Sequence, residues 1–301
     1  MEIQYIDKAQ EGKAQFSLVF ITFAMVVVAY AIIGQIPLTI SILQTGISFE
    51  EHLDLKLLGE MIGKTTLLFY LIIPFIFGFV ALLVAIKYIH KRSVLSLFTI
   101  RKTIDWKRFF TSFFIWGSVL SLSLWVNHLT TGNISWNFNP SLFFPLLIVA
   151  LVLIPIQTTF EEILFRGYLT QELQALVKKP LISMLISAIL FGLMHASNPE
   201  IEILGYGVLS YYMLSGLFLG FITFYDDGIE LAMGYHAMNN IFAAVLLTNN
   251  WQVFQTDALF MDLNPPSFSW EAILTLVILQ PLLFFVFAKR YRWNWKSRKL
   301  I

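Results

Sequence analysis

The sequence contains no cysteine, and charged residues make up only 13% of its 301 residues. The absence of cysteine excludes a disulfide framework, a thiolate-ligated zinc site and a thiol nucleophile. A soluble domain carries roughly twice that fraction of charged residues. The formal net charge of +1 offers no broad basic surface for nucleic acid, so no nucleic-acid partner is expected.

Hydrophobic residues take the place of the missing charge and make up 57% of the chain. Most of the apolar segments approach the roughly 20 residues that a helix needs to cross a bilayer, and the fifth and seventh are shorter. No alternation typical of a β-barrel is sustained. The sequence therefore predicts an all-α, polytopic membrane helical bundle of about eight transmembrane helices, surrounded by lipid. The predicted spans are 16–40, 65–86, 109–126, 142–160, 181–195, 204–225, 231–247 and 272–288.

Lysine and arginine set the predicted orientation. They are concentrated in segment 87–108 and in the tail after residue 288. Eight spans place both segments on one side, which the positive-inside rule assigns to the cytoplasm. We therefore expect a multi-pass protein of the cell membrane with cytoplasmic N- and C-termini, and the lysine-rich inner loops and lack of cysteine favour a bacterial source.

Two polar segments on the predicted inner side are interpreted more simply. Asp226, Asp227 and Glu230 form an acidic cluster, of which Asp226 and Asp227 are expected to be a solvated turn. The tail "KRYRWNWKSRKL" interleaves aromatic and cationic residues, a pattern that favours an anchor at the lipid headgroups.

Ionisable side chains within membrane spans are costly and are functional candidates by default. Three groups qualify: Glu161, Glu162 and Arg166 in "FEEILFR", His195 in "FGLMH", and His236 with Asn240 in "GYHAMNN". The remaining histidines, His52, His90 and His128, fall in predicted loops and receive no role.

Helical spacing predicts how these groups are arranged. Glu162 and Arg166 are four residues apart, as are His236 and Asn240, so each pair shares a helix face. Glu161 is rotated by about 100° from Glu162, which leaves it free when Arg166 neutralises Glu162. A turn at "VKKP" predicts an antiparallel hairpin that brings Glu161 and His195 to the same height, with the end of the hairpin projecting into the cytoplasm.

Each group also has a purely structural interpretation. The two glutamates could begin an interfacial helix, His195 could donate to a carbonyl at a helix end, and Asn240 could join neighbouring helices. The occurrence of all three groups at compatible depths favours a single functional site.

The ordered motifs Glu161-Glu162-x-x-x-Arg166, Phe191-x-x-x-His195 and His236-x-x-x-Asn240 resemble those of the CPBP family of intramembrane proteases. That family includes the Rce1-like type II CAAX endopeptidases and bacterial Abi proteins linked to bacteriocin processing and immunity. The resemblance covers roughly residues 157–245.

The resemblance implies a role for each matching residue. Glu161 and His195 would activate the attacking water, His236 and Asn240 would stabilise the oxyanion, and Glu162 and Arg166 would support the site. The chain is therefore divided into N-terminal helices with a basic interfacial segment (1–140), a core that carries the resemblance and is expected to be catalytic (141–250), and a C-terminal helix with a basic tail (251–301).

Amide hydrolysis suits these residues because a glutamate in a dry pocket is a competent base and an asparagine amide can stabilise an oxyanion. A catalytic zinc held by Glu161, His195 and His236 is the competing mechanism. The sequence lacks the compact H-E-x-x-H spacing of many zinc peptidases, so a glutamate-type enzyme with no cofactor is preferred.

The expected function is an intramembrane endopeptidase that acts on a membrane-associated peptide or protein. A non-catalytic scaffold or bacteriocin-immunity protein that uses the same cavity is the alternative. A proton-coupled transporter is also compatible with buried Glu and His, but the sequence lacks the repeats and interrupted helix pairs typical of transporters.

Overall fold

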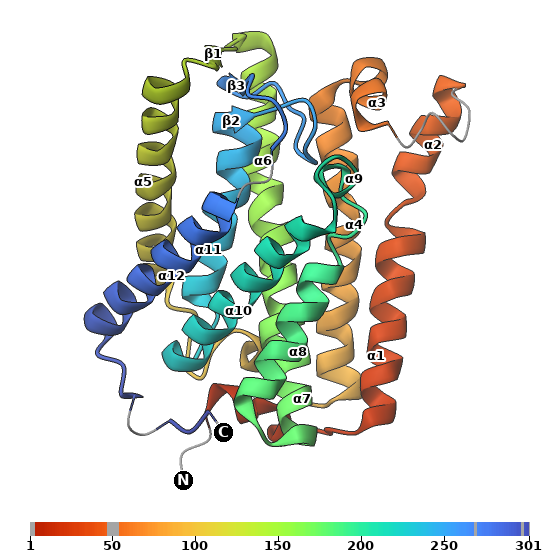
Figure 1. Ribbon diagram of the computed structural model, residues 1–301. Helices are drawn as coiled ribbons and strands as arrows, with labels where there is room; N and C mark the ends of the chain where they lie inside the picture. Colours follow the sequence, from red (N-terminus) through yellow and green to blue (C-terminus); the bar gives the residue numbers. More distant parts are fainter. Residues whose placement is uncertain (1–3, 47–53, 268–269, 296–297, 301) are drawn as a thin grey trace.

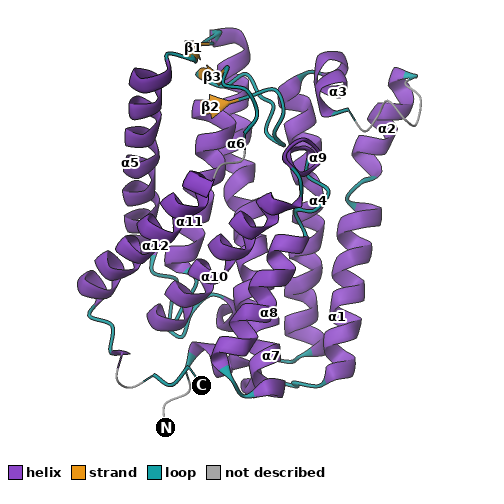
Figure 2. Cartoon of the chain, viewed as in Figure 1, coloured by secondary structure: helices purple, strands orange, loops and turns teal. Residues whose placement is uncertain are grey.

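A computed structural model describes residues 4–46, 54–267, 270–295 and 298–300. Within this part of the chain, helices run side by side as a bundle (Figures 1 and 2). The predicted all-α class is confirmed. The α-helices are α1 (Phe16–Val28), α2 (Ile36–Thr45), α3 (Leu55–Ile62), α4 (Lys64–Val84), α5 (Trp106–Thr131), α6 (Pro140–Glu162), α7 (Thr170–Val177), α8 (Pro180–Leu193), α9 (Pro199–Leu204), α10 (Leu209–Asp226), α11 (Glu230–Ile241) and α12 (Trp270–Tyr291).

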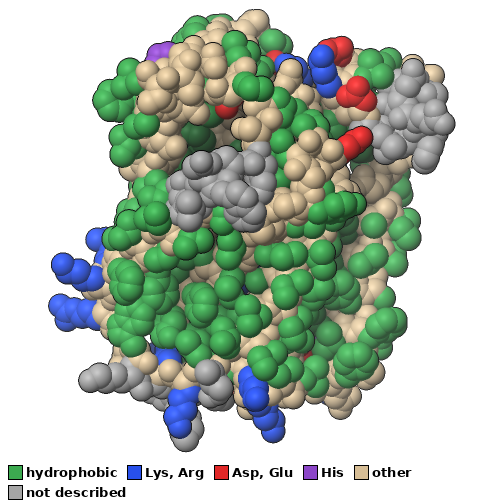
Figure 3. Space-filling model, viewed as in Figure 1, with side chains coloured by type: hydrophobic (Ala, Val, Ile, Leu, Met, Phe, Trp, Pro, Cys, Tyr) green, Lys and Arg blue, Asp and Glu red, His purple; other side chains and the backbone are tan. Residues whose placement is uncertain are grey.

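The bundle has the dimensions and surface of a multi-pass membrane protein. Large side chains such as Phe114 and Ile148 are 63% and 67% exposed, and Figure 3 shows a broad hydrophobic surface with charged side chains mainly at its edges. Because water would penalise so much exposed apolar area, this surface fits lipid. Within the described residues, five helical segments are long and apolar enough to span a membrane: Phe16–Thr45, Lys64–Ile89, Trp106–Thr131, Pro140–Val177 and Tyr206–Asp226.

Each of the eight predicted spans contains a helix, but eight crossings are not thereby established. Helix α8 is apolar but shorter than the five segments above, and α11 has 12 residues. Both described ends of the chain lie at one end of the bundle (Figure 1), where Leu181 N–H donates to the carbonyl of Leu300 at 3.0 Å. The side of the membrane on which this end lies stays a prediction.

A three-stranded sheet closes the opposite end of the bundle, and the sequence did not predict it. Strand β3 (Phe260–Asp262) lies between β1 (Ile134–Trp136) and β2 (Leu247–Thr248), antiparallel to β1 and parallel to β2. Such short strands offer too little alternation to be recognised. The sheet connects the end of α5 to the segment that follows α11, and so fixes the ends of two helices that frame the site.

The acidic turn between α10 and α11 is not the solvated turn that the sequence suggested. Asp226 is 3% exposed and Glu230 is fully buried. Arg101 contacts both carboxylates at 3.2 Å, and Arg108 forms a second ion pair with Asp226. The sequence could not reveal this pairing, because the cations come from segment 87–108, more than 100 residues before the turn.

The C-terminal tail contacts the same turn in addition to any contact with lipid. Trp293 Nε1 donates to Asp226 at 2.9 Å, and Arg298 pairs with Asp227. At the N-terminus, Tyr5 N–H donates to Asp227 at 3.1 Å. The turn therefore joins both described chain ends to the helical bundle.

Of the histidines outside the motifs, His90 lies in a connecting segment as predicted but is buried, whereas His128 lies in a helix. His90 is fully buried; its Nδ1 donates to the Lys13 carbonyl at 2.9 Å, and its Nε2 lies 3.0 Å from the Thr22 hydroxyl and 3.1 Å from that of Tyr168. Burial lowers the pKa of His90, so it serves as a neutral hydrogen-bonding centre. His128 lies within α5, and His52 lies outside the described residues.

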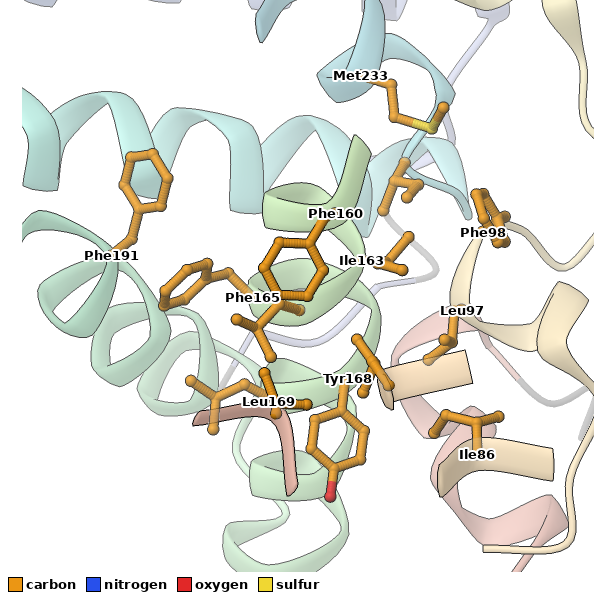
Figure 4. Close-up of a cluster of buried hydrophobic side chains, with 14 of the residues drawn as sticks. Ile86, Leu97, Phe98, Phe160, Ile163, Phe165, Tyr168, Leu169, Phe191 and Met233 are labelled. Atoms are coloured by element: carbon orange, nitrogen blue, oxygen red, sulfur yellow. The ribbon is translucent and has the colours of Figure 1, made fainter. Parts of the chain in front are cut away.

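The largest hydrophobic cluster surrounds the helix that carries the paired glutamates. Phe160 precedes the pair and Ile163 follows it, and both are buried with Phe165, Phe191 and Met233 (Figure 4). Each buried aromatic or aliphatic side chain of this size contributes about 1.5–3 kcal/mol. The polar groups of α6 are therefore held in a tightly packed apolar frame.

Helices α5 and α11 approach each other closely at Gly234, and this contact gives a test of the packing. A Cβ at Gly234 would lie 2.1 Å from the Phe109 carbonyl oxygen. We expect Gly234→Ala to lower the free energy of unfolding by about 1–3 kcal/mol, because the two backbones must separate. Thermal unfolding in detergent, followed by tryptophan fluorescence, measures the change.

Gly220→Ala is the matched control. The added Cβ would meet only Met184 side-chain atoms, at ordinary distances from 3.6 Å, and alanine favours a helix by up to about 1 kcal/mol over glycine. Equal unfolding temperatures for the two variants would contradict the close packing of α5 on α11.

Candidate active site

The C-terminal end of α6 carries the paired glutamates, and a π-helical segment, Ile163–Leu169, follows directly. Arg166 lies within this segment and donates to Glu162 Oε1 at 2.9 Å and to the Gly216 carbonyl at 3.1 Å. Short π-helical turns often occur at functional sites. Here the altered hydrogen bonding leaves the Phe165 carbonyl to accept from two hydroxyls, those of Thr170 and Ser187, at 2.7 and 2.8 Å.

Glu162 is the structural member of the pair. It is fully buried, and its Oε1 accepts from Arg166 and from His236 Nδ1, the latter at 2.8 Å. Because a carboxylate oxygen only accepts when ionised, this contact assigns a proton to Nδ1 of His236. The ion pair between Glu162 and Arg166 is the one that the spacing of four residues predicts.

Glu161 faces the other nitrogen of the same imidazole. His236 Nε2 lies 3.3 Å from Glu161 Oε2. An imidazole protonated at both nitrogens would form an ion pair with Glu161 at this distance, in addition to its contact with Glu162. The side chain of Glu161 retains 14% exposure, and its Oε2 is a buried oxygen without a hydrogen-bond partner in the described structure.

A chain of amides orients Asn240 beside this group. Trp116 Nε1 on α5 donates to the side-chain oxygen of Asn239 at 3.2 Å, and Asn239 Nδ2 donates to the side-chain oxygen of Asn240 at 3.3 Å. Asn240 Nδ2 in turn donates to the side-chain oxygen of Gln157 at 3.2 Å. Gln157 in turn interacts with the Glu161 carboxylate. One N–H of the Asn240 amide is thus committed to Gln157, and the second remains for another acceptor.

His195 lies near this polar group, because its ring and that of His236 both contact the ring of Phe191. It follows the end of α8, and its Nδ1 donates to the Phe191 carbonyl at 2.8 Å. The Phe191 ring is 4.9 Å from the His195 ring and 5.9 Å from the His236 ring. Because Nδ1 carries the proton donated to the Phe191 carbonyl, the neutral imidazole has an unprotonated Nε2.

The structure therefore brings together Glu161, Glu162, Arg166, His236 and Asn240, with His195 one ring away. The direct neighbour of Glu161 is His236, whereas the sequence had paired Glu161 with His195. This difference arises because helical periodicity predicts which residues share a face of one helix. It does not predict which neighbouring helix packs against that face.

Several residues of the site were not predicted from the sequence. Gln157 precedes Glu161 by four residues, and this spacing could have identified it as a neighbour on the same face. Trp116 and Tyr30 come from helices far from the motifs, and Tyr30 interacts electrostatically with Glu161. No local pattern marks these two aromatic residues.

A zinc site was the competing interpretation, and the donor set can be tested against it. Within the described residues, no three His, Asp or Glu side chains converge closely enough to hold a metal ion. Both nitrogens of His236 face carboxylates, and Nδ1 of His195 faces a carbonyl. Glu161, His195 and His236 as arranged therefore do not fit a three-ligand metal centre.

These features define a helical membrane protein with a buried Glu–His–Asn site. Residues 140–242 match the family model described as "Type II CAAX prenyl endopeptidase Rce1-like". This range includes all seven residues of the three motifs, and the resemblance stated from those motifs is confirmed; the matched residues are called the Rce1-like domain below. The family is one of intramembrane proteases, which supports assignment to the peptidase class.

The chain is also similar to "Uncharacterized protein YyaK" of Bacillus subtilis (strain 168). The two sequences are 29% identical over 274 residues, which cover 89% of this chain and 90% of the relative. The similarity thus extends well beyond the Rce1-like domain and includes most of the N-terminal helices. No solved structure matches the chain.

Proposed function

We propose that the protein is an intramembrane endopeptidase that hydrolyses peptide bonds of a membrane-associated peptide or protein. The observation that carries this proposal is the position of Glu161: its Oε2 lies 3.3 Å from His236 Nε2 and has no hydrogen-bond partner in the described structure, so a water molecule can be bound there. The Rce1-like domain supports the same class of reaction.

Glu161 acts as the general base. A water bound at its carboxylate loses a proton to Glu161 as the water oxygen attacks the substrate carbonyl carbon. His195 directs its unprotonated Nε2 to the same water, because Nδ1 is held by the Phe191 carbonyl. The proton taken from water is then delivered to the leaving amine as the C–N bond breaks.

His236 and Asn240 stabilise the negative oxygen that forms during attack. Once Glu161 accepts the proton of the water, its attraction for the His236 Nε2–H weakens, and this N–H can donate to the oxyanion. The second N–H of Asn240 provides the other donor. Glu162 holds the opposite nitrogen of His236 at 2.8 Å, so the donor is oriented before the reaction begins.

We propose a glutamate-type mechanism with no cofactor. It is supported by the donor arrangement, in which His236 is bound between two carboxylates. The substrate is proposed to be a peptide of the pheromone or bacteriocin type, processed at the cytoplasmic side of a bacterial cell membrane.

The test is a comparison of the peptides in membranes from cells that produce the wild-type protein or His195→Gln at matched levels. We expect peptide termini that are present with the wild type and absent with His195→Gln, because the water loses one of its two activating groups. Mass spectrometry identifies the termini and hence the substrate.

His128→Gln is the matched control, since His128 is exposed near the C-terminal end of α5 and belongs to none of the motifs. It should give the wild-type pattern. Identical peptide sets for all three proteins, with His195→Gln still restoring any deletion phenotype, would favour a non-catalytic scaffold or immunity protein that uses the same cavity.

A further inference from the structure

A second polar cluster lies on the side of His195 that faces α10. Tyr212 on α10 donates its hydroxyl to Glu200 Oε1 on α9, and Asn198 Nδ2 donates to the same oxygen at 2.9 Å. Asn198 Nδ2 also lies 3.5 Å from the Tyr212 hydroxyl. Two side chains thus donate to one oxygen of Glu200: that of Tyr212 from α10 and that of Asn198 from the turn before α9.

Burial makes this cluster costly as a mere structural feature. Glu200 is 4% exposed, and its Oε2 is a buried atom without a hydrogen-bond partner in the described structure. A buried carboxylate with an unsatisfied oxygen destabilises a fold, and apolar residues of similar shape would pack at lower cost. This cost indicates that the cluster has a function, which is to hold a neighbouring side chain in place.

The cluster holds the aromatic ring on which His195 rests. The rings of Tyr212 and His195 are stacked, with centroids 4.0 Å apart and planes inclined by 17°. This is the closest ring contact of His195, since the Phe191 centroid lies at 4.9 Å and its plane is tilted by 60°. The Tyr212 ring fixes the plane of the imidazole, and the Phe191 carbonyl fixes its tautomer.

We propose that Tyr212 and Glu200 are positioning residues for His195. Glu200 anchors the Tyr212 hydroxyl, and the anchored ring sets the orientation in which His195 Nε2 meets the attacking water. This inference rests on the proposed function for its catalytic consequence, but the orientation itself is a property of the resting protein.

Nuclear magnetic resonance of histidine-labelled protein in detergent micelles reads this orientation without any turnover. The His195 signals are assigned by their loss in His195→Gln. We expect a single Nδ1–H tautomer in the wild type, with the ring C–H protons shifted by the current of the stacked Tyr212 ring.

Glu200→Leu removes the anchor and should abolish that ring-current shift, while Glu200→Gln, which keeps an acceptor oxygen, should retain it. Tyr212→Phe keeps the ring but loses its hydroxyl, and it should reduce the shift even where Glu200→Leu fails to fold. Glu202→Leu, an exposed neighbour on α9, is the matched control and should leave the spectrum unchanged.

Cleavage of the peptide identified from membranes gives the second readout. Glu200→Leu and Tyr212→Phe should lower kcat about 10- to 100-fold with little change in KM, because a catalytic group misplaced by about 1 Å costs that much. Glu200→Gln should restore most of the rate.

The two hypotheses fail in different ways. A His195 ring-current shift that persists in both Glu200→Leu and Tyr212→Phe would overturn the positioning role, whatever the activity. A shift that responds as expected in a protein that cleaves no peptide would retain the positioning role and reject the peptidase.

Discussion

Glu161→Gln is expected to lower the rate of peptide cleavage by about 10²- to 10⁴-fold, the usual contribution of a general base, while the helical bundle stays intact. Glutamine has the shape of glutamate but cannot accept the proton of the attacking water. Its amide can still contact His236, whose Nε2 lies 3.3 Å from the carboxylate in the wild-type chain. Purified protein in proteoliposomes, supplied with the peptide found in membranes, gives the rate.

The controls separate the loss of the base from other causes. Glu60→Gln changes an exposed glutamate on α3 and should retain full activity. Dialysis of the wild-type protein against a chelator should leave its rate unchanged if protein groups alone activate the water. A Glu161→Gln variant with wild-type activity would reject Glu161 as the base, and a rate lost on chelation and regained with zinc would instead favour the metal mechanism.

The sequence could predict contacts made within one helix. Arg166 lies four residues after Glu162, and the structure pairs them at 2.9 Å. His236 and Asn240 lie on one face of α11 by the same rule, and this face meets α6, since His236 contacts both glutamates and Asn240 contacts Gln157. The spacing alone could not show that the direct neighbour of Glu161 would be His236 on α11 and not His195.

Contacts between distant segments could not be predicted from periodicity. The apolar segments gave the helices of the bundle, since each is long and hydrophobic enough to be recognised. The burial of Asp226, however, depends on Arg101 and Arg108 from a separate basic segment, and no local pattern records that pairing. From the local sequence an acidic turn is expected to be solvated, and only the folded structure shows that Arg101 and Arg108 neutralise Asp226.

The site also depends on helices outside the Rce1-like domain. Trp116 of α5 begins the amide chain that ends at Gln157, and Gly234 allows α5 to approach α11 closely. The match to YyaK covers 89% of this chain, which includes α5. The N-terminal helices thus orient the site as well as span the membrane, and the motifs alone are an incomplete description of it.

Breaking the Glu162–Arg166 ion pair is expected to have the largest effect on stability. Both side chains are at most 2% exposed, so removal of one partner leaves a buried charge without its counterion. Glu162→Leu and Arg166→Met should each lower the free energy of unfolding by about 3–5 kcal/mol. The unfolding midpoint in a detergent titration, followed by tryptophan fluorescence, measures the loss.

The double variant distinguishes a structural role from a catalytic one. Glu162→Leu with Arg166→Met removes both charges, and it should be more stable than either single variant because no unpaired charge remains. It should nevertheless cleave no peptide, since His236 Nδ1 loses the carboxylate that holds it at 2.8 Å.

As a matched control, Glu11→Leu breaks the partly exposed pair with Lys8 and should cost at most about 1 kcal/mol. If the buried pair cost no more than this surface pair, its proposed support of the site would be rejected; if the double variant kept its activity, Glu162 would have no part in orienting His236.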